Sequence, residues 1–253
     1  MQIAIIGYGH VGKAMHQIFP GAAVYDEGLN IGNKADLLDS HIAFVCVPTP
    51  MLPNGECDSS IVEEVVGWID AEVIVLRSTV PVGFTTYLQE KTGKRIVFQP
   101  EYYGETVDHP FADLGSRKWI TLGGSPEDIA VVVGVYQKVH NAELKIMTSD
   151  AKTAELAKYM ENCFLALKVT FCNEFYDIAQ AHGIQYHELR ELWLADPRMG
   201  HSHTFVYEDD RGFGGKCLPK DVNALIALAD KKAVNVDLMK TILAKNNGLR
   251  NDY

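Results

Sequence analysis

Two hydrophobic patterns divide the chain. From about residue 2 to residue 147, short apolar runs rich in Val, Ile and Phe alternate with segments of helix length. This alternation is typical of βα units that build a parallel sheet. We predict strands at 3–6, 22–25, 42–47, 73–76, 95–98, 119–122 and 144–147. Residues 1–148 are therefore predicted to form a doubly wound α/β domain.

After residue 148 the strand pattern stops. No proline or glycine occurs from Asp150 to His182, and Gly183 can end a helix there. At ~1.5 Å per residue such a helix is about 50 Å long. Its apolar residues occupy more than one stripe, which predicts burial on several sides and a second copy of the chain as the cover. With shorter helices at 187–194, 219–229 and 236–246, residues 149–253 are predicted to form an all-helical domain that makes a homodimer through the helix at 150–182.

Composition and charge exclude several classes of protein. The chain has 253 residues, of which 47% are hydrophobic and 22% charged, and a net charge of −10. The excess of acidic residues works against binding to nucleic acid or to an anionic membrane surface. The apolar runs are far shorter than the ~20 residues of a membrane helix. We therefore expect no nucleic-acid partner and no membrane partner.

The cysteines and the first residues favour a cytoplasmic protein. The first charged side chain, Lys13, follows a glycine-rich turn instead of preceding an apolar stretch, so we expect no secretory signal. Five cysteines without a CxxC pair fit reduced thiols better than a disulfide framework.

A glycine motif after the first predicted strand points to a dinucleotide. Gly7, Gly9 and Gly12 form GxGxxG and open a helix, with His10 and Val11 inside the motif. Glycines there permit a tight turn and let a pyrophosphate lie on the helix N-terminus. This is the Rossmann type of doubly wound sheet.

The second predicted strand ends at Asp26, where a carboxylate can accept hydrogen bonds from a ribose diol and would repel a 2′-phosphate. NAD is therefore predicted over NADP. Two later strand ends supply further residues for the cofactor site at the carboxyl edge of the sheet. They are Val47, Pro48, Thr49, Ser78 and Thr79.

The run Gly212-Phe213-Gly214-Gly215-Lys216-Cys217-Leu218-Pro219-Lys220-Asp221 places a cysteine at the start of a helix. The helix dipole and the two lysines favour the thiolate form of that cysteine. Cys217 is therefore the candidate nucleophile, against the alternative of a small buried residue. The glycines before it would let a ligand approach the backbone.

Other polar residues carry weaker signals. Lys158 and Asn162 are four apart and share one face of the long helix, where the lysine either meets an anion or is solvated. Glu101 and Glu105 follow the fifth predicted strand, and either could position a water or the nicotinamide, or only cap the next element. His201 and His203 have no third ligand at suitable spacing, so we predict no metal site.

Together these motifs resemble the UDP-glucose/GDP-mannose 6-dehydrogenase family. The matching runs are GxGxxG with Asp26, VPTP (47–50), STVPVG (78–83), PEYYGE (100–105), ELAKYMEN (155–162), DPRMG (196–200) and GFGGKCLPKD (212–221). They keep their order and extend over nearly the whole chain.

The resemblance implies a four-electron oxidation of the C6 primary alcohol of a nucleotide sugar by two NAD+ in succession. Cys217 would capture the aldehyde and carry the thioester that water hydrolyses. Lys158 and Asn162 would hold the oxyanion, Asp221 with Thr79 would organise water and proton transfer, Glu101 would serve hydrolysis, and Glu105 would lie near the nicotinamide. The expected substrate contacts are Tyr102, Tyr103, Arg198, Arg211, Gly212, Phe213, Gly214 and Lys220.

Two alternatives stay open at this stage. A single-step 3-hydroxyacid dehydrogenase shares the general architecture and a helix lysine but needs no cysteine. A catalytically idle NAD-binding subunit is the other alternative. It arises because family members usually continue into a C-terminal nucleotide-sugar-binding domain, which we expect to be lacking here, and the stretch 26–41 is shorter than in the family.

Overall fold

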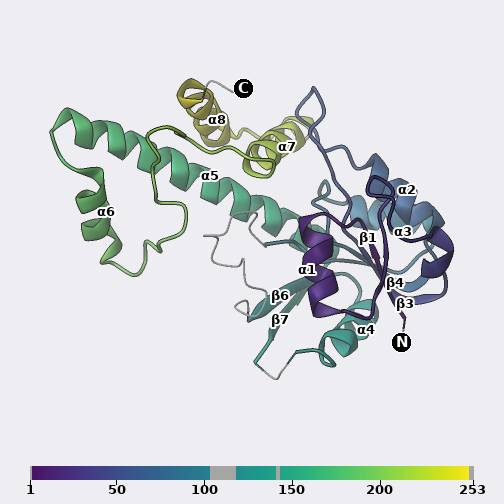
Figure 1. Ribbon diagram of the computed structural model, residues 1–253. Helices are drawn as coiled ribbons and strands as arrows, with labels where there is room; N and C mark the ends of the chain where they lie inside the picture. Colours follow the sequence, from purple (N-terminus) through teal and green to yellow (C-terminus); the bar gives the residue numbers. More distant parts are fainter. Residues whose placement is uncertain (1, 103–117, 141–142, 251–253) are drawn as a thin grey trace. The chain divides into compact units, whose positions relative to one another are not determined.

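The computed structural model describes residues 2–102, 118–140 and 143–250 (Figure 1). The chain divides into two compact units, and each is described by itself. Unit 1 is Met1–Pro50 with Cys57–Lys158, and unit 2 is Met51–Glu56 with Tyr159–Tyr253. The predicted domain boundary after residue 148 stays a prediction.

The elements follow the βα alternation and then the helical run. The strands are β1 (Ile3–Ile6), β2 (Ala23–Tyr25), β3 (Ser40–Val45), β4 (Ala71–Leu76), β5 (Ile96–Phe98), β6 (Trp119–Gly123) and β7 (Lys145–Ser149). The helices are α1 (His10–Ile18), the 3-10 helix η1 (Lys34–Leu37), α2 (Ser60–Trp68), α3 (Phe84–Thr92), α4 (Pro126–Tyr136), α5 (Ala151–Ala181), α6 (Tyr186–Leu194), α7 (Leu218–Lys231) and α8 (Asp237–Leu249). All seven predicted strands and all five predicted helices are confirmed within a few residues.

Unit 1 is built on a sheet with the strand order β2-β1-β3-β4-β5-β6-β7. The order turns back at β1, as in a doubly wound sheet, so the predicted Rossmann-type fold is confirmed. The pairs are parallel except β5 with β6, which meet antiparallel at Phe98 and Gly123. The prediction of a parallel sheet missed this pair, since apolar content marks a strand but not its direction.

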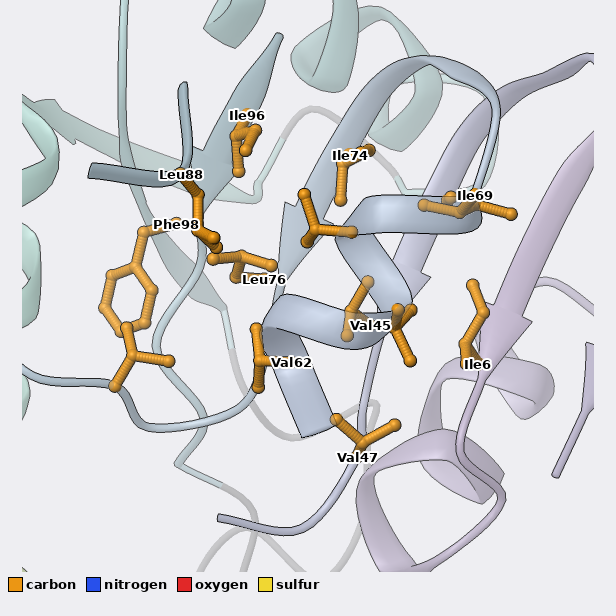
Figure 2. Close-up of a cluster of buried hydrophobic side chains, with 14 of the residues drawn as sticks. Ile6, Val45, Val47, Val62, Ile69, Ile74, Leu76, Leu88, Ile96 and Phe98 are labelled. Carbon is orange, nitrogen blue, oxygen red and sulfur yellow. The ribbon is translucent and has the colours of Figure 1, made fainter. Parts of the chain in front are cut away.

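Both faces of the sheet are covered, because successive residues of a strand point to opposite sides. One face packs on α2 and α3, and Figure 2 shows part of this cluster, in which Ile6, Val45 and Leu76 meet Val62 and Leu88. The residues between them in sequence, such as Ile5 and Phe44, face α1 and α4 in a second buried cluster. The strands β1, β3, β4 and β5 are therefore buried over most or all of their length.

β2 is an edge strand of the sheet, and a short segment connects its end at Tyr25 to the start of β3 at Ser40. Asp26 and Ile31 form an antiparallel bridge, which turns the chain back along β2. The ammonium of Lys34 then lies over the rings of Tyr25 and Trp68, with its nitrogen 5.7 and 5.0 Å from their centroids. A turn and η1 thus connect β2 to β3.

Unit 2 is helical. In one cluster α5 packs with α7 and α8, and the side chain of Phe213, from the loop before α7, is buried among them. In a second cluster Cys172 and Ala179 of α5 pack on Tyr186 of α6. Across the described residues, no helix has both the length and the apolar character needed to cross a membrane.

Candidate active site

The glycine motif forms a tight junction between β1, α1 and β3. Gly7 has φ +90°, and a Cβ there would lie 2.6 Å from the carbonyl oxygen of Cys46. A Cβ on Gly12 would lie 1.9 Å from the carbonyl oxygen of Gly7. Both positions therefore need glycine for the fold itself. Gly9 differs, because a Cβ there would meet nothing within 4 Å.

The N-terminus of α1 is suited to an anion. Gly9 caps the helix without a side-chain hydrogen bond, and the first turn carries no acidic residue. Gly9 and His10 are exposed, while Val11 is half-buried against the sheet. The first N–H groups and the positive end of the helix dipole therefore face a glycine-lined turn. This arrangement fits a pyrophosphate.

Asp26 lies beside the same turn. Its Oδ2 accepts a hydrogen bond from the backbone N–H of Tyr8 at 2.6 Å, and its Oδ1 accepts one from Leu29 at 2.8 Å. A carboxylate has about four acceptor positions. Two therefore remain for hydroxyl groups, as the ribose role requires.

The next two strand ends are tied together at the carboxyl edge. The Ser78 hydroxyl donates to the carbonyl oxygen of Val47 at 2.6 Å, and both residues are buried. Thr49 is buried and Pro48 exposed. Thr79 is half-buried, and its carbonyl oxygen lies 3.4 Å from the Sγ of Cys57.

Cys57 was missed by sequence reasoning. Its polar neighbours suggest an exposed loop, but the structure buries it, and its thiol contacts the carbonyl oxygens of Thr79 and, at 4.0 Å, Thr49. A weak S–H donor can link the two strand ends in this way. No sequence signal separates this role from an incidental cysteine.

Glu101 follows β5 and is held on both oxygens. The guanidinium of Arg77, which is fully buried at the end of β4, forms an ion pair with Oε2. The backbone N–H of Tyr102 donates to Oε1 at 2.6 Å. The ring of Tyr102 is buried and lies 4.7 Å from the Nζ of Lys158, which is also buried. Two predicted catalytic residues of unit 1, Glu101 and Lys158, therefore both contact Tyr102.

Arg77 is a second residue that sequence reasoning left out. Besides the ion pair with Glu101, it donates to the carbonyl oxygens of Gln99 and Pro100 at 3.3 and 3.4 Å. A charged residue directly after the apolar strand β4 was the available signal. The predicted residues Tyr103 and Glu105 lie outside the described residues.

Glu155 is a third. Its carboxylate accepts the backbone N–H groups of Gly83 at 2.5 Å and Thr85 at 2.9 Å, and so caps the N-terminus of α3 from α5. Burial raises the pKa of Glu155 above its usual value, and these hydrogen bonds partly offset that rise. The residue fixes the first turn of α5 to the segment that follows Thr79.

Unit 2 contains Cys217, the predicted nucleophile, and several of the polar residues predicted to act with it. Cys217 is exposed and is the N-cap residue of α7. One turn into the helix, Asp221 is buried, with its Oδ2 accepting from the Asn162 amide at 2.5 Å and its Oδ1 from the Lys220 ammonium at 2.6 Å. Asn162 and Lys158 are one turn apart on α5. The structure thus links three predicted residues, Asn162, Asp221 and Lys220, near the start of α7.

The loop before Cys217 packs against the rest of unit 2, and its expected substrate contacts stay predictions. The side chain of Phe213 belongs to the core of unit 2, and the close approach allowed by Gly212 and Gly214 is to side chains of α8. Arg211 donates to Asn173 and Asp177, and Arg198 is exposed and paired with Asp196. The two glycines are therefore explained by the fold of this chain.

Cys217 should be the reactive thiol of the native protein. Burial raises the pKa of Cys46 and of Cys163 to about 12, and it also raises the pKa of Cys172. Cys57 is buried as well. Iodoacetamide at neutral pH should therefore modify one equivalent per chain rapidly, and peptide mapping should place it on Cys217. Rapid labelling of a second cysteine would contradict this assignment.

Within the described ranges, no group of three or more His, Cys, Asp or Glu side chains could hold a metal ion. His201 and His203 lie in the loop between α6 and α7, where the His203 ring contacts the hydroxyl of Ser202. The carboxylates described above, Asp26, Glu101, Glu155 and Asp221, accept hydrogen bonds from backbone N–H groups or from other side chains.

Two family models match the chain. Residues 22–140 match the NAD-binding domain of the UDP-glucose/GDP-mannose dehydrogenase family, and residues 152–248 match the central domain of the same family. The UDP-glucose 6-dehydrogenase of Pseudomonas aeruginosa is 28% identical over 232 residues, which is 83% of this chain and 49% of that protein. The chain thus spans about half the length of that relative.

Solved structures show the same fold. A UDP-glucose dehydrogenase from Pyrobaculum islandicum matches with a TM-score of 0.80 and 23% identity over 98% of this chain and 68% of that one. A 3-hydroxyisobutyrate dehydrogenase from Mycobacterium tuberculosis matches with a TM-score of 0.71 and 16% identity over 96% of this chain and 91% of that one. Fold alone does not separate these two kinds of enzyme, but the family models do. The chain belongs to the UDP-glucose/GDP-mannose dehydrogenase family and carries its NAD-binding and central domains.

Proposed function

We propose that this chain takes part in the NAD-dependent oxidation of the C6 primary alcohol of a nucleotide sugar to the carboxylate, through a thioester on Cys217. Residues 1–148 would bind the cofactor and residues 149–253 would carry the nucleophile. The observation that supports this most directly is the exposed thiol of Cys217 at the N-terminus of α7, one turn from the buried pair Asp221 and Asn162.

The glycine turn and Asp26 would hold the dinucleotide. The N-terminus of α1 offers N–H groups to the pyrophosphate, and Asp26 keeps acceptor positions for the ribose hydroxyls. Val47 to Thr49 and Ser78 to Thr79 would line the nicotinamide end, with Glu105 close to it. Bound NAD+ supplies a hydride acceptor.

Cys217 would make the overall oxidation possible in one site. Its thiolate adds to the aldehyde carbon, so that a C–S bond forms and the carbonyl oxygen becomes an oxyanion. Bound NAD+ would supply the hydride acceptor for the alcohol and, in a second round, for this adduct, which would then become a thioester on Cys217. Water then adds, the C–S bond breaks, and the thiolate and a carboxylate are released.

Other polar groups of the chain would stabilise each stage. Lys158 and Asn162 would hold the oxyanion, which is a strong effect where water is excluded. Asp221 with Thr79 would organise water and proton transfer, and Glu101, fixed by Arg77, would serve hydrolysis.

The proposed substrate contacts are those that the sequence predicts. We keep Lys220 and the exposed Arg198 as contacts for its anionic groups. Tyr102, Tyr103 and Arg211 stay proposed contacts, as do the backbone groups of residues 212–214.

Substitutions in the glycine turn should separate folding from cofactor binding. Gly12→Ala should lower the free energy of unfolding by about 1–3 kcal/mol, because its Cβ would meet the Gly7 carbonyl. Gly9→Ala should leave the melting temperature unchanged yet weaken NAD binding at least tenfold. Thermal unfolding and titration with NAD+ measure the two effects, and equal NAD affinity in Gly9→Ala would argue against the pyrophosphate position.

The two other functions make different predictions for ligands. UDP-glucose or GDP-mannose, added with NAD+, should raise the melting temperature and yield NADH. Turnover of 3-hydroxyisobutyrate instead would favour a 3-hydroxyacid dehydrogenase. NAD binding without turnover of either class would favour an idle subunit.

The free-thiol state of all five cysteines is consistent with a cytoplasmic site of action.

We also propose that the chain forms a homodimer through α5. Large apolar side chains are exposed along this helix. They are Leu156, Met160, Phe164, Phe171, Phe175 and Ile178, from 41% to 75% exposed. Their spacing of three, four and seven residues places them in a stripe along the helix. The same stripe on a second copy is a self-complementary cover of the kind that two-fold dimers use.

Charges in this stripe should dissociate the dimer. Met160→Glu with Phe164→Glu should shift the mass measured by light scattering from dimer to monomer. Val234→Glu changes a similarly exposed apolar residue in the loop between α7 and α8 and is the control. A stripe variant that keeps the wild-type mass would contradict the proposed interface.

A further inference from the structure

Helix α8 holds the loop that leads to Cys217 through a buried asparagine. The Oδ1 of Asn246 accepts a hydrogen bond from the Phe213 backbone N–H at 2.6 Å, and its Nδ2 donates to the Phe213 carbonyl oxygen at 3.0 Å. Asn246 is 1% exposed, although its neighbour Asn247 is exposed. A buried amide is costly unless it is hydrogen-bonded, and here one side chain binds both polar groups of one residue.

Arg250 continues this contact one helical turn later. Its Nη1 lies 3.4 Å from the Arg211 carbonyl oxygen and 2.9 Å from Asp210 Oδ1. Its guanidinium carbon would lie 2.6 Å from a Cβ on Gly214. Asn246 lies in the last turn of α8 and Arg250 is the residue that directly follows the helix, and both side chains reach the same loop.

The loop is also held from the opposite side. Asn173 of α5 is buried, and its Oδ1 accepts from Arg211 Nε at 2.6 Å and from the Gly212 N–H at 3.3 Å. The Phe213 side chain fills the core between α5, α7 and α8. Residues 211–213 are therefore fixed by side-chain hydrogen bonds to two helices and by burial.

Only Gly214, Gly215 and Lys216 separate this fixed segment from Cys217. Two glycines would give a free loop many conformations, and Gly215 has φ +73°. Fixing Phe213 therefore restricts where the chain can enter α7. A thiol gains from the helix dipole only within the first turn.

We propose that Asn246 and Arg250 make α8 a positioning element for the nucleophile, holding loop 211–214 so that Cys217 stays at the N-terminus of α7. The inference rests on the proposed role of Cys217. It assigns a function to the last helix of the described chain, which the sequence marked only as a helix.

The test measures the rate of Cys217 alkylation by iodoacetamide as a function of pH, in the absence of NAD+ and of any sugar. Asn246→Ala should move the midpoint of the profile to higher pH and lower the rate at neutral pH about two- to fivefold, as expected when a thiolate leaves a helix terminus. Asn247→Ala is the matched control and should behave as wild type. Arg250→Gln tests the same loop if Asn246→Ala does not fold, and should shift the midpoint in the same direction.

The profile separates positioning from general stability. Loss of stability alone would expose Cys163 and speed its labelling while leaving the Cys217 midpoint unmoved, and that result would overturn the proposal. An unchanged Cys217 profile in both Asn246→Ala and Arg250→Gln would also overturn it. Because the measurement needs no turnover, its failure is distinct from an absence of NADH formation, which would instead count against the proposed function.

Discussion

Cys217→Ala is expected to lower the rate of carboxylate formation by at least about a thousandfold, because no other exposed thiol among the described cysteines could capture the aldehyde. The alanine variant should still bind NAD+ with wild-type affinity, since the glycine turn belongs to unit 1. Product analysis by mass spectrometry and titration with NAD+ measure the two properties.

The variant also separates chemistry from folding. Cys217 is exposed at a helix terminus, so its loss should change the melting temperature little. A variant that folds, binds NAD+ and still makes carboxylate at the wild-type rate would show that Cys217 is not the nucleophile.

Lys158→Met should be the second large effect, with kcat about a hundred- to a thousandfold lower. Its ammonium is the buried positive charge next to Tyr102, and methionine keeps the length and the apolar stem without the charge. Removal of one donor that stabilises an oxyanion typically costs a factor of this size.

The same helix provides the control for this prediction. Lys152 lies on the first turns of α5 but is exposed. Lys152→Met should therefore leave kcat within about twofold of wild type. A loss of activity that is equal in both variants would indicate an effect on the helix and not on an oxyanion.

Much of the fold could be predicted from the sequence because its signals are local. Short segments rich in apolar residues mark the strands of unit 1, and the absence of proline and glycine marks α5. The antiparallel pairing of β5 with β6 depends on contacts between distant segments, so no local pattern indicates it. The grouping of Met51–Glu56 with unit 2 likewise depends on contacts with residues far away in the sequence.

The candidate site divides in the same way. Gly7, Asp26 and Cys217 could be proposed as site residues from the sequence because their residue types and their places beside strands and helices suggest a chemical role. Arg77, Glu155 and Asn246 could not, because each acts on the backbone or side chain of a residue that is far away in the sequence.

Phe213 illustrates what a sequence motif does not predict. Its motif suggests a substrate contact, which stays a prediction, and its side chain is buried in the core of unit 2, which leaves its backbone groups for such a contact. A motif fixes which residues occur together but not which of them faces a ligand.

The central claim is that one thiol carries the substrate through two oxidation steps, and counting NADH tests it most directly. NADH formed per molecule of nucleotide sugar consumed should be two in the wild-type protein, and no carboxylate should form with Cys217→Ala. A yield of one NADH per substrate that is unchanged in Cys217→Ala would contradict the account.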